Sequence, residues 1–310
     1  MDFFYLFCIS AVSLISYKIL IPFFKKKLFA MPTTRGFHEK RKPTSGGIIF
    51  VTIFIICSLV NKVYLPLLSL PMAIVGLLDD KYNIPGIQKY IYQLLTVLGI
   101  TIYTANFSNG FMGQYINENS YIYLILIFFG TAIINIINFM DGIDGLIAGS
   151  SIIIFLTIFT NELNYISAFI IPLFVFLYFN WYPSKLFMGD SGSLFIGSYL
   201  LSLIYTSSSN EGSLKIILLC FPLLIDSTIC LIRRLINKQN IFRPHKLHLY
   251  QRLVSNGLSH SLVSLLYIFM TFLLSILYFF SNYKYMVICN IFILIFGMYL
   301  DKKYAKKFNS

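Results

Sequence analysis

Long apolar segments, separated by short polar or basic stretches, make up most of this 310-residue chain. Several approach the roughly 20 residues with which a helix crosses the hydrocarbon core of a bilayer. None shows the strict apolar–polar alternation of a membrane β-barrel strand, so helices are the spanning form that the pattern favours. The pattern predicts eleven transmembrane helices: Phe3–Phe24, Gly46–Val60, Tyr64–Leu78, Tyr90–Thr104, Tyr121–Asn138, Ile147–Phe159, Tyr165–Asn180, Gly192–Thr206, Leu214–Ile232, Ser261–Phe280 and Lys284–Leu300.

The composition agrees with this pattern. Hydrophobic residues make up 57% of the chain and charged residues 12%, whereas about a quarter of the residues of a soluble domain are charged. We therefore predict an all-α, polytopic helical membrane protein that forms a single integral membrane domain over residues 1–310. The five cysteines all lie within apolar segments and show no paired spacing. Such cysteines are typical of buried side chains rather than of a disulfide framework or a metal site.

The basic residues are unevenly distributed among the connecting segments. If the N-terminus lies outside, the inside segments are residues 25–45, 79–89, 139–146, 181–191 and 233–260 and the tail from residue 301. These segments hold 20 of the 24 lysine and arginine residues, which predicts that they face the cytoplasm. The net charge of +12 is explained by this bias and by contacts with anionic lipid headgroups, so it indicates no nucleic-acid partner.

Acidic, amide and histidine side chains gather at the inside ends of the predicted spans. A carboxylate at the centre of a bilayer costs about 2.5–3.5 kcal/mol on the insertion scale, so repeated carboxylates at span ends indicate a site at the membrane face. One such aspartate alone would be better explained as a helix cap, but the clusters recur along the chain. The residues concerned are Asp79, Asp80, Asn138, Asp141, Asp144, Asn180, Asp190, His245 and His248.

This set of side chains suits a divalent cation and a phosphate. Carboxylate and amide oxygens are hard ligands for Mg²⁺, with Mn²⁺ as an alternative, and Mg²⁺ completes its coordination with water and substrate phosphate. Gly189 and Gly192 beside Asp190 would let a phosphate approach a helix N-terminus, although the same sequence also suits a simple cap. The basic segment with Arg35 and Lys40 would supply countercharge, although the positive-inside bias explains each of these residues by itself.

Five motifs follow one another along the chain in a recognisable order. They are Leu78-Asp-Asp80 followed by Gln93, Asn135-x-x-Asn-x-x-Asp-Gly-x-Asp-Gly-Leu146, Asn180 ten residues before Asp190, Phe187-Met-Gly-Asp-Ser-Gly-Ser-Leu194 and His245-x-x-His248. In order and spacing they resemble the polyprenyl-phosphate N-acetylhexosamine-1-phosphate transferases, from Arg35 to about Arg252. That family includes the peptidoglycan translocase and the enzymes that start O-antigen and teichoic acid on undecaprenyl phosphate.

The resemblance implies ten or eleven helices and a Mg²⁺ site at the cytoplasmic face of the bacterial inner membrane. In the implied reaction a lipid phosphate attacks the β-phosphorus of a UDP-N-acetylhexosamine and gives lipid-diphospho-sugar and UMP. The implied partners are this UDP-sugar, undecaprenyl phosphate and the bilayer, with a homodimer left open. The roles carried over by motif are Asp190 and Asn138 as metal ligands, Asp79 and Asp80 as catalytic residues near the lipid phosphate, and Asp141, Asp144, Asn180, His245, His248, Arg35 and Lys40 in substrate binding.

The donor sugar is left open among UDP-GlcNAc, UDP-FucNAc and UDP-QuiNAc. The segment from Pro244 to Arg252 resembles the O-antigen-initiating branch, because Tyr250 and Gln251 stand where many relatives have histidines. Phospho-MurNAc-pentapeptide transfer in peptidoglycan synthesis is the alternative. A transporter would be expected to show inverted repeats with charges near the midplane. A membrane prenyltransferase of aromatic acceptors would show repeated Asp-x-x-x-Asp motifs, and neither pattern is present in the sequence.

Overall fold

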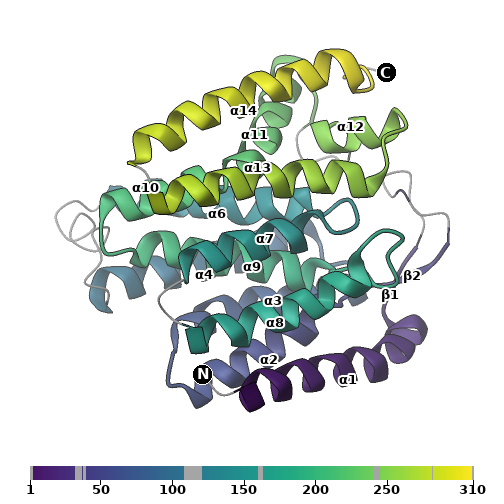
Figure 1. Ribbon diagram of the computed structural model, residues 1–310, viewed down its shortest axis with the longest axis vertical. Helices are drawn as coiled ribbons and strands as arrows, with labels where there is room; N and C mark the ends of the chain where they lie inside the picture. The colour runs from purple at the N-terminus through teal and green to yellow at the C-terminus, as the bar shows by residue number, and fades with distance from the viewer. Residues whose placement is uncertain are drawn as a thin grey trace.

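The chain is almost entirely helical. The computed structural model describes residues 3–31, 37, 40–107, 121–159, 163–240, 245–280 and 282–308. Within these ranges it has thirteen α-helices, one short 3-10 helix and a single two-stranded antiparallel hairpin. Most helices run side by side across the view of Figure 1, and the hairpin and the short helix α12 lie at the same end of the bundle. The all-α prediction is confirmed.

The predicted spans coincide with the observed helices. Two of them are divided, since Tyr64–Leu78 covers η1 and α3 and Leu214–Ile232 covers α10 and α11. The elements are α1 (Phe3–Lys27), β1 (Phe29–Ala30), β2 (Lys42–Pro43), α2 (Gly47–Val60), η1 (Leu65–Ser69), α3 (Leu70–Tyr82), α4 (Gly86–Phe107), α6 (Ile122–Met140), α7 (Leu146–Ile158), α8 (Leu163–Asn180), α9 (Asp190–Thr206), α10 (Asn210–Leu219), α11 (Phe221–Ile236), α12 (Leu249–Ser255), α13 (His260–Phe280) and α14 (Tyr283–Tyr304).

The predicted span Leu214–Ile232 is not one straight helix. Helices α10 and α11 meet at Cys220, which closes the first and precedes the second, and their axes differ by 70°. Pro222 lies in the first turn of α11. It has no N–H with which to continue the hydrogen bonds of α10, and its fixed φ suits the start of a new helix. The bend therefore has a local cause in the sequence.

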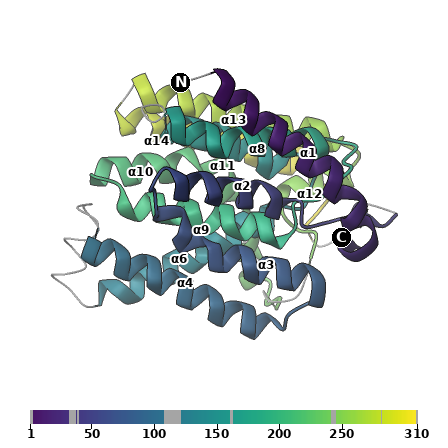
Figure 2. The same ribbon diagram turned by 90° about the horizontal axis from the view of Figure 1, so that it is seen from below.

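Several helices have the length and composition of membrane spans. Helices α1, α6, α13 and α14 qualify by these two criteria, and the bent pair of α10 and α11 makes a fifth if it counts as one span. Large apolar side chains such as Phe4, Phe128 and Phe280 are exposed on the outside, as a lipid-facing surface requires. Helix α1 begins at one end of the bundle and α14 ends at the other in both views (Figures 1 and 2). The protein is a polytopic membrane protein, as predicted.

Helix α9 lies in the middle of the bundle (Figure 2). Every residue from Ser191 to Ser202 is buried, which is typical of a helix that is surrounded on all sides. Helices α2, α3 and α6 pack against it. Gly76 allows the close approach of α3, because a Cβ atom at this position would lie 2.3 Å from the carbonyl carbon of Asp190. This contact brings the end of α3 to the start of α9.

Candidate active site

Three aspartates meet where α3 ends and α9 begins. Asp79 and Asp80 lie in the last turn of α3, and Asp190 is the first residue of α9. The Oδ1 atom of Asp80 accepts a hydrogen bond of 2.9 Å from the backbone N–H of Asp190, and its Oδ2 atom accepts one of 2.7 Å from the Ser45 hydroxyl. We call Asp79, Asp80 and Asp190 the carboxylate cluster. The sequence motifs predicted its members but gave no role to Ser45.

Gly189 is required by the contact between Asp80 and Asp190. Its φ of +74° lies in the region that favours glycine. A Cβ atom there would lie 2.3 Å from Oδ2 of Asp80 and 2.7 Å from the backbone nitrogen of Ser45. The space at this glycine is taken by the Asp80 carboxylate, and the expected approach of a phosphate beside Gly189 stays a prediction. The glycine therefore shapes the carboxylate cluster itself.

Lys89, in the first turn of α4, bridges two members of the cluster. Its Nζ atom donates to Oδ2 of Asp79 at 2.9 Å and also to Oδ2 of Asp190. Burial lowers the pKa of Lys89, but the charges of Asp190 and Asp79 outweigh this effect and raise it. Sequence reasoning counted Lys89 only as part of the positive-inside bias. Its place ten residues after Asp79 becomes informative only once α3 and α4 are seen to pack together.

Two amide side chains of α6 hold the neighbouring helices. Asn138 donates its amide N–H groups to Oδ1 of Asp190 and to the hydroxyl of Ser193, both at 2.9 Å. Asn135 and Gln93 exchange a reciprocal pair of amide hydrogen bonds, each 3.1 Å long, which ties α4 to α6. The structure therefore brings Asn138 against Asp190, as predicted, and the contact is made through its amide nitrogen.

The cluster holds more negative than positive charge. Burial and the charge of Asp190 raise the pKa of Asp80 to about 7. Burial also raises the pKa of Asp79, and the pKa of Asp141 is raised well above its usual range by burial and by the charges of Asp190 and Asp80. The pKa of Asp190 is lowered, because the charge of Lys89 and the hydrogen bonds with Asp79, Lys89 and Asn138 together outweigh the effect of burial. In the described part of the chain Lys89 is the cation in contact with the cluster, so a divalent cation would relieve the repulsion that remains.

Asp144 and Asn180 join two turns beside the cluster. Asp144 is buried and accepts hydrogen bonds from the backbone N–H of Ser184, at 3.0 Å, and from the Ser184 hydroxyl, at 2.8 Å. Asn180 accepts from the N–H of Gly145 at 2.9 Å and donates to the carbonyl of Leu186 at 3.0 Å. These contacts hold the α6–α7 turn against the α8–α9 connection. The predicted contact of both residues with substrate stays a prediction.

The loop before α12, residues 245–248, is called the histidine loop here. His248 is buried, with its ring stacked between those of His245, at 5.0 Å, and Tyr250, at 5.7 Å. Burial, helped by the charge of Arg234, lowers the pKa of His248 to about 4. The Tyr250 hydroxyl donates to the carbonyl of Phe139 at 2.8 Å. The histidine loop thus lies beside the α6–α7 turn, which carries Asp141.

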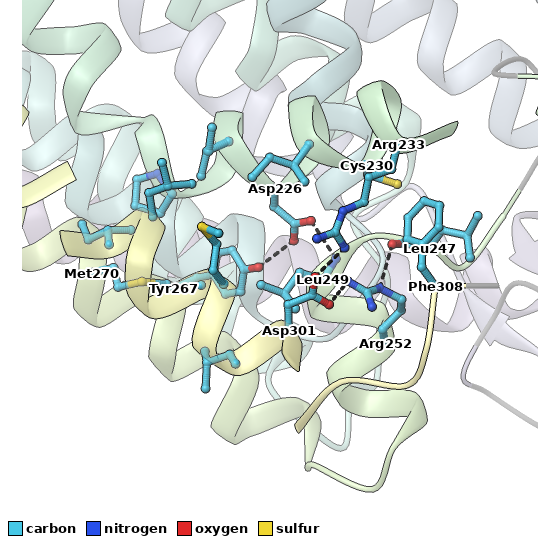
Figure 3. Close-up of a pocket in the computed structure, with 18 residues that line it drawn as sticks. Asp226, Cys230, Arg233, Leu247, Leu249, Arg252, Tyr267, Met270, Asp301 and Phe308 are labelled. Atoms are coloured by element: carbon cyan, nitrogen blue, oxygen red, sulfur yellow. Dashed lines mark hydrogen bonds and ion pairs between the residues drawn. The ribbon is translucent and has the colours of Figure 1, made fainter. Parts of the chain in front are cut away.

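Asp226 organises the histidine loop from within a predicted span. Its carboxylate accepts hydrogen bonds from the N–H groups of Leu249 and Tyr250, at 2.7 and 3.1 Å, and from the Tyr267 hydroxyl at 2.6 Å. It therefore caps the start of α12 and links it to α11 and α13 (Figure 3). Sequence reasoning missed this residue. A carboxylate inside an apolar span was the signal that could have found it.

The C-terminal segment fastens α12 to α11. Asp301, at the end of α14, forms ion pairs with Arg233 of α11 and Arg252 of α12 (Figure 3). Both guanidinium groups also lie over the ring of Phe308, at 5.6 and 5.4 Å from its centroid. Arg252 further donates to the carbonyl of Lys306 at 2.9 Å. The last residues of the chain therefore help to hold the histidine loop.

The remaining two predicted site residues lie in the basic segment between α1 and α2. Arg35 lies outside the described residues. Lys40 is exposed and precedes β2 by two residues. Its predicted contact with substrate stays a prediction.

Comparison with known proteins identifies the family. The model of glycosyl transferase family 4 matches residues 63–208. The probable undecaprenyl-phosphate N-acetylglucosaminyl 1-phosphate transferase of Bacillus subtilis is 31% identical over 293 residues, which cover 86% of this chain and 82% of that protein. This chain belongs to glycosyl transferase family 4. The resemblance seen in the sequence is thereby confirmed.

Two further relatives of this chain carry different names. An undecaprenyl-phosphate alpha-N-acetylglucosaminyl 1-phosphate transferase of Thermotoga maritima is 28% identical over 232 residues, 74% of each chain. A phospho-N-acetylmuramoyl-pentapeptide-transferase of Dictyoglomus turgidum is 32% identical over 208 residues, 62% of this chain and 67% of that protein. The family match over residues 63–208 contains the carboxylate cluster and ends before the histidine loop.

Proposed function

We propose that this protein is a Mg²⁺-dependent transferase that moves N-acetylglucosamine-1-phosphate from UDP-GlcNAc to undecaprenyl phosphate. UMP is released, and the lipid-linked sugar starts a cell-surface polysaccharide. The observation that carries this proposal is the convergence of Asp79, Asp80 and Asp190 around Lys89 in a member of glycosyl transferase family 4. The names of the relatives from Bacillus subtilis and Thermotoga maritima support the choice of sugar.

The carboxylate cluster has the donor atoms that Mg²⁺ requires. Asp190 is the proposed principal ligand, because its carboxylate lies between Lys89 and Asn138 with Asp79 and Asp80 beside it. Carboxylates crowded together in this way are a favourable site for a hard divalent cation, which offsets their mutual repulsion. When bound, the ion would neutralise the charge of the diphosphate. Asn138 keeps Asp190 oriented, which is the role that its hydrogen bond supports.

The chain itself contributes position and charge. An oxygen of the lipid phosphate forms a bond to the β-phosphorus of the UDP-sugar while the bond from that phosphorus to the bridging oxygen breaks, so that UMP leaves with the electron pair. A phosphate monoester is largely dianionic at neutral pH, so a strong base is not required. We assign Asp79 and Asp80 to the lipid-phosphate side of the site and Lys89 to charge compensation. Positioning and electrostatic stabilisation then supply most of the catalysis.

The 6-deoxy donors UDP-FucNAc and UDP-QuiNAc remain the alternative. They were favoured by Tyr250 and Gln251, but the Tyr250 hydroxyl is engaged by the carbonyl of Phe139 and its side chain is fully buried. A side chain used in this way braces the α6–α7 turn. We therefore place UDP-GlcNAc first.

The experiment that tests the proposal is UMP release by the purified protein. UDP-GlcNAc, UDP-FucNAc, UDP-QuiNAc and UDP-MurNAc-pentapeptide are compared, each with and without undecaprenyl phosphate and Mg²⁺. We expect release from UDP-GlcNAc only when both the lipid phosphate and Mg²⁺ are present, and loss of activity in EDTA that added Mg²⁺ restores. Release without the lipid would indicate hydrolysis, and full activity in EDTA would contradict the metal requirement.

We also propose that the site faces the cytoplasm of a bacterial inner membrane. The excess of lysine and arginine in the segments around the carboxylate cluster supports this orientation. Single cysteines introduced in a cysteine-free background at Ser255, the last residue of α12, and at Asn61, directly after α2, provide a matched pair of exposed positions. We expect an impermeant maleimide to label the Asn61 position from outside intact cells and to spare the Ser255 position. The reverse pattern would overturn the proposed orientation.

A further inference from the structure

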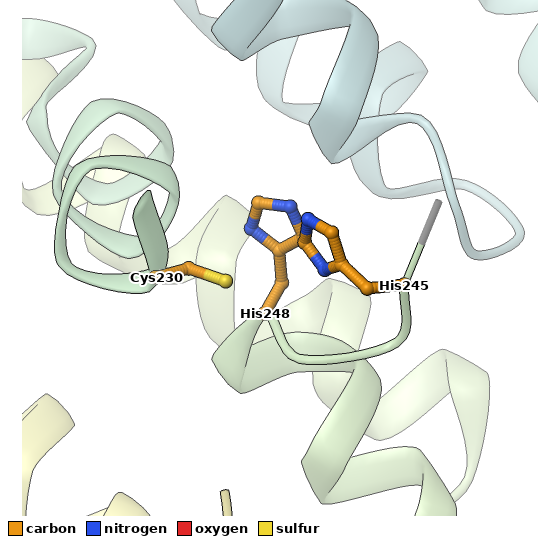
Figure 4. Close-up of side chains that lie close together, drawn as sticks. All are labelled: Cys230, His245 and His248. Atoms are coloured by element: carbon orange, nitrogen blue, oxygen red, sulfur yellow. The ribbon is translucent and has the colours of Figure 1, made fainter. Parts of the chain in front are cut away.

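Cys230 lies against the histidine loop. Cys230 belongs to α11, whereas His245 and His248 precede α12, and one sulfur or nitrogen atom from each of the three residues lies within 4.8 Å of the other two. Figure 4 shows the thiol directed toward the two imidazole rings. The sequence pattern predicted that the cysteines are only buried apolar side chains. The fold gives Cys230 a different environment, because the loop returns to α11.

The spacing of these atoms is close to that of a zinc site. Tetrahedral zinc with bonds of about 2.3 Å to sulfur and about 2.0–2.1 Å to nitrogen places its ligand atoms roughly 3.3–3.6 Å apart. The three atoms here would have to approach by about an ångström, which small side-chain rotations on a loop can supply. The two imidazole rings are stacked at 5.0 Å with an angle of 26° between them. Both rings can therefore present a nitrogen to one ion.

His248 provides the second, independent observation. Only 2% of this residue is exposed, and its Nδ1 atom has no hydrogen-bond partner among the described residues. A buried polar atom left unpaired is unfavourable by about 1–3 kcal/mol, so each such atom in a folded protein calls for a partner or a role, and a bound ion is one of these. The nearest carboxylate oxygen, Oδ1 of Asp226, is 3.9 Å away, too far for a hydrogen bond. A metal ion would give the buried nitrogen a partner.

We propose that Cys230, His245 and His248 bind a zinc ion that ties the histidine loop to α11. A thiolate with two imidazoles is a softer ligand set than the oxygens of the carboxylate cluster, and it selects zinc over magnesium. The Asp226 carboxylate beside His248 adds negative charge next to the cation. Three protein ligands leave a fourth position for water. The ion would fix the loop that packs against the α6–α7 turn, a role beyond the transferase chemistry proposed above.

Direct measurement of zinc content tests this proposal. The protein is purified without a polyhistidine tag, with excess Mg²⁺ to occupy the carboxylate cluster, and is titrated with Zn²⁺ against a chromophoric chelator. We expect about one zinc per chain, and an affinity lowered at least about tenfold in Cys230→Ser and in His248→Ala. Cys220→Ser, a buried cysteine outside the group, is the matched control and should keep the wild-type affinity. Asp190→Asn should keep it as well.

Cobalt substitution identifies the ligand. We expect a thiolate-to-cobalt charge-transfer band in the wild type and in Cys220→Ser, and its absence in Cys230→Ser.

His245→Ala changes a partly exposed loop residue, so it tests the site even if the Cys230 and His248 variants fail to fold. Absence of zinc from the wild type, or wild-type affinity in both Cys230→Ser and His245→Ala, would overturn the proposal. Loss of the zinc in Asp190→Asn would do the same, because the ion would then belong to the carboxylate cluster. None of these outcomes depends on transferase activity.

Discussion

Asp190 and Asp226 are both aspartates held by neighbouring helices, but their surroundings differ in kind. Asp226 accepts hydrogen bonds from two backbone N–H groups and one tyrosine hydroxyl, and no other carboxylate contacts it among the described residues. Asp190 is paired with Lys89 and Asn138, yet it lies directly beside Asp79 and Asp80. A carboxylate that accepts hydrogen bonds from several donors and has no other carboxylate beside it stabilises the fold. A carboxylate crowded by others retains the capacity to bind a cation.

Replacement of Asp190 by Asn should have the largest effect. The change removes charge from the proposed principal metal ligand with little change in shape, and loss of such an electrostatic contact costs about two or more orders of magnitude in rate. UMP release at saturating Mg²⁺ measures the rate, and thermal unfolding shows that the protein remains folded. Retention of more than about a tenth of the wild-type rate would contradict the assignment.

Lys89→Gln tests whether Lys89 and Mg²⁺ bind the same carboxylates. Lys89 binds the same carboxylates as the proposed metal, so its removal should lower the Mg²⁺ concentration needed for half-maximal activity. The maximal rate should fall by about tenfold, because a fixed positive charge is lost from the site. A Mg²⁺ titration of the initial rate gives both values. Lys81→Gln, an exposed lysine of α3, is the control, and an unchanged Mg²⁺ requirement in Lys89→Gln would refute a shared site.

Asp226→Asn tests the other region with the same chemical change as Asp190→Asn. An amide cannot accept hydrogen bonds from all three donors, so we expect a loss of about 1–3 kcal/mol in the free energy of unfolding. The unfolding temperature should fall by several degrees, and the KM for the UDP-sugar should rise more than kcat falls. A catalytic loss as large as that of Asp190→Asn at an unchanged unfolding temperature would show that the two aspartates do not differ as described.

Tyr267→Phe should have the smallest effect. It removes one of the three donors to Asp226 and leaves the two backbone N–H groups in place. We expect about 0.5–1.5 kcal/mol of lost stability and a rate within about twofold of the wild type. Differential scanning fluorimetry beside Tyr278→Phe, a change on the same helix, measures the stability. A larger loss than in Asp226→Asn would mean that the hydroxyl has a role apart from this carboxylate.

Much of the fold could be predicted from the sequence because the helices coincide with long apolar segments of the chain. Every predicted span falls on helical structure, and the motifs correctly placed Asp79, Asp80, Asn138 and Asp190 together. The bend between α10 and α11 was missed, although Pro222 gave a local signal for it. An uninterrupted hydrophobic run reveals the length of apolar structure but not the direction that the chain takes within it.

The rest of the site depends on contacts between distant segments. In the sequence, Lys89 looks like an ordinary loop lysine, and only the packing of α4 against α3 brings it to Asp79. Ser45 lies outside every motif, although its hydroxyl donates a hydrogen bond to Asp80. Asn180 belongs to a motif, yet its side chain joins Gly145 to Leu186. Motif spacing singled out Asn180 but not Lys89 or Ser45. It could not distinguish a side chain that meets substrate from one that holds the backbone around it.

The contacts of Asp301 and Phe308 with Arg233 and Arg252 have a consequence for the order in which the protein folds. Asp79, Asp80 and Asp190 emerge from the ribosome more than a hundred residues before the partners of Arg252 do. The residues of the carboxylate cluster are therefore translated before α12 can form its contacts with Asp301 and Phe308. A chain that stops before Asp301 would keep the carboxylate cluster but would leave Arg233 and Arg252 without this acidic partner.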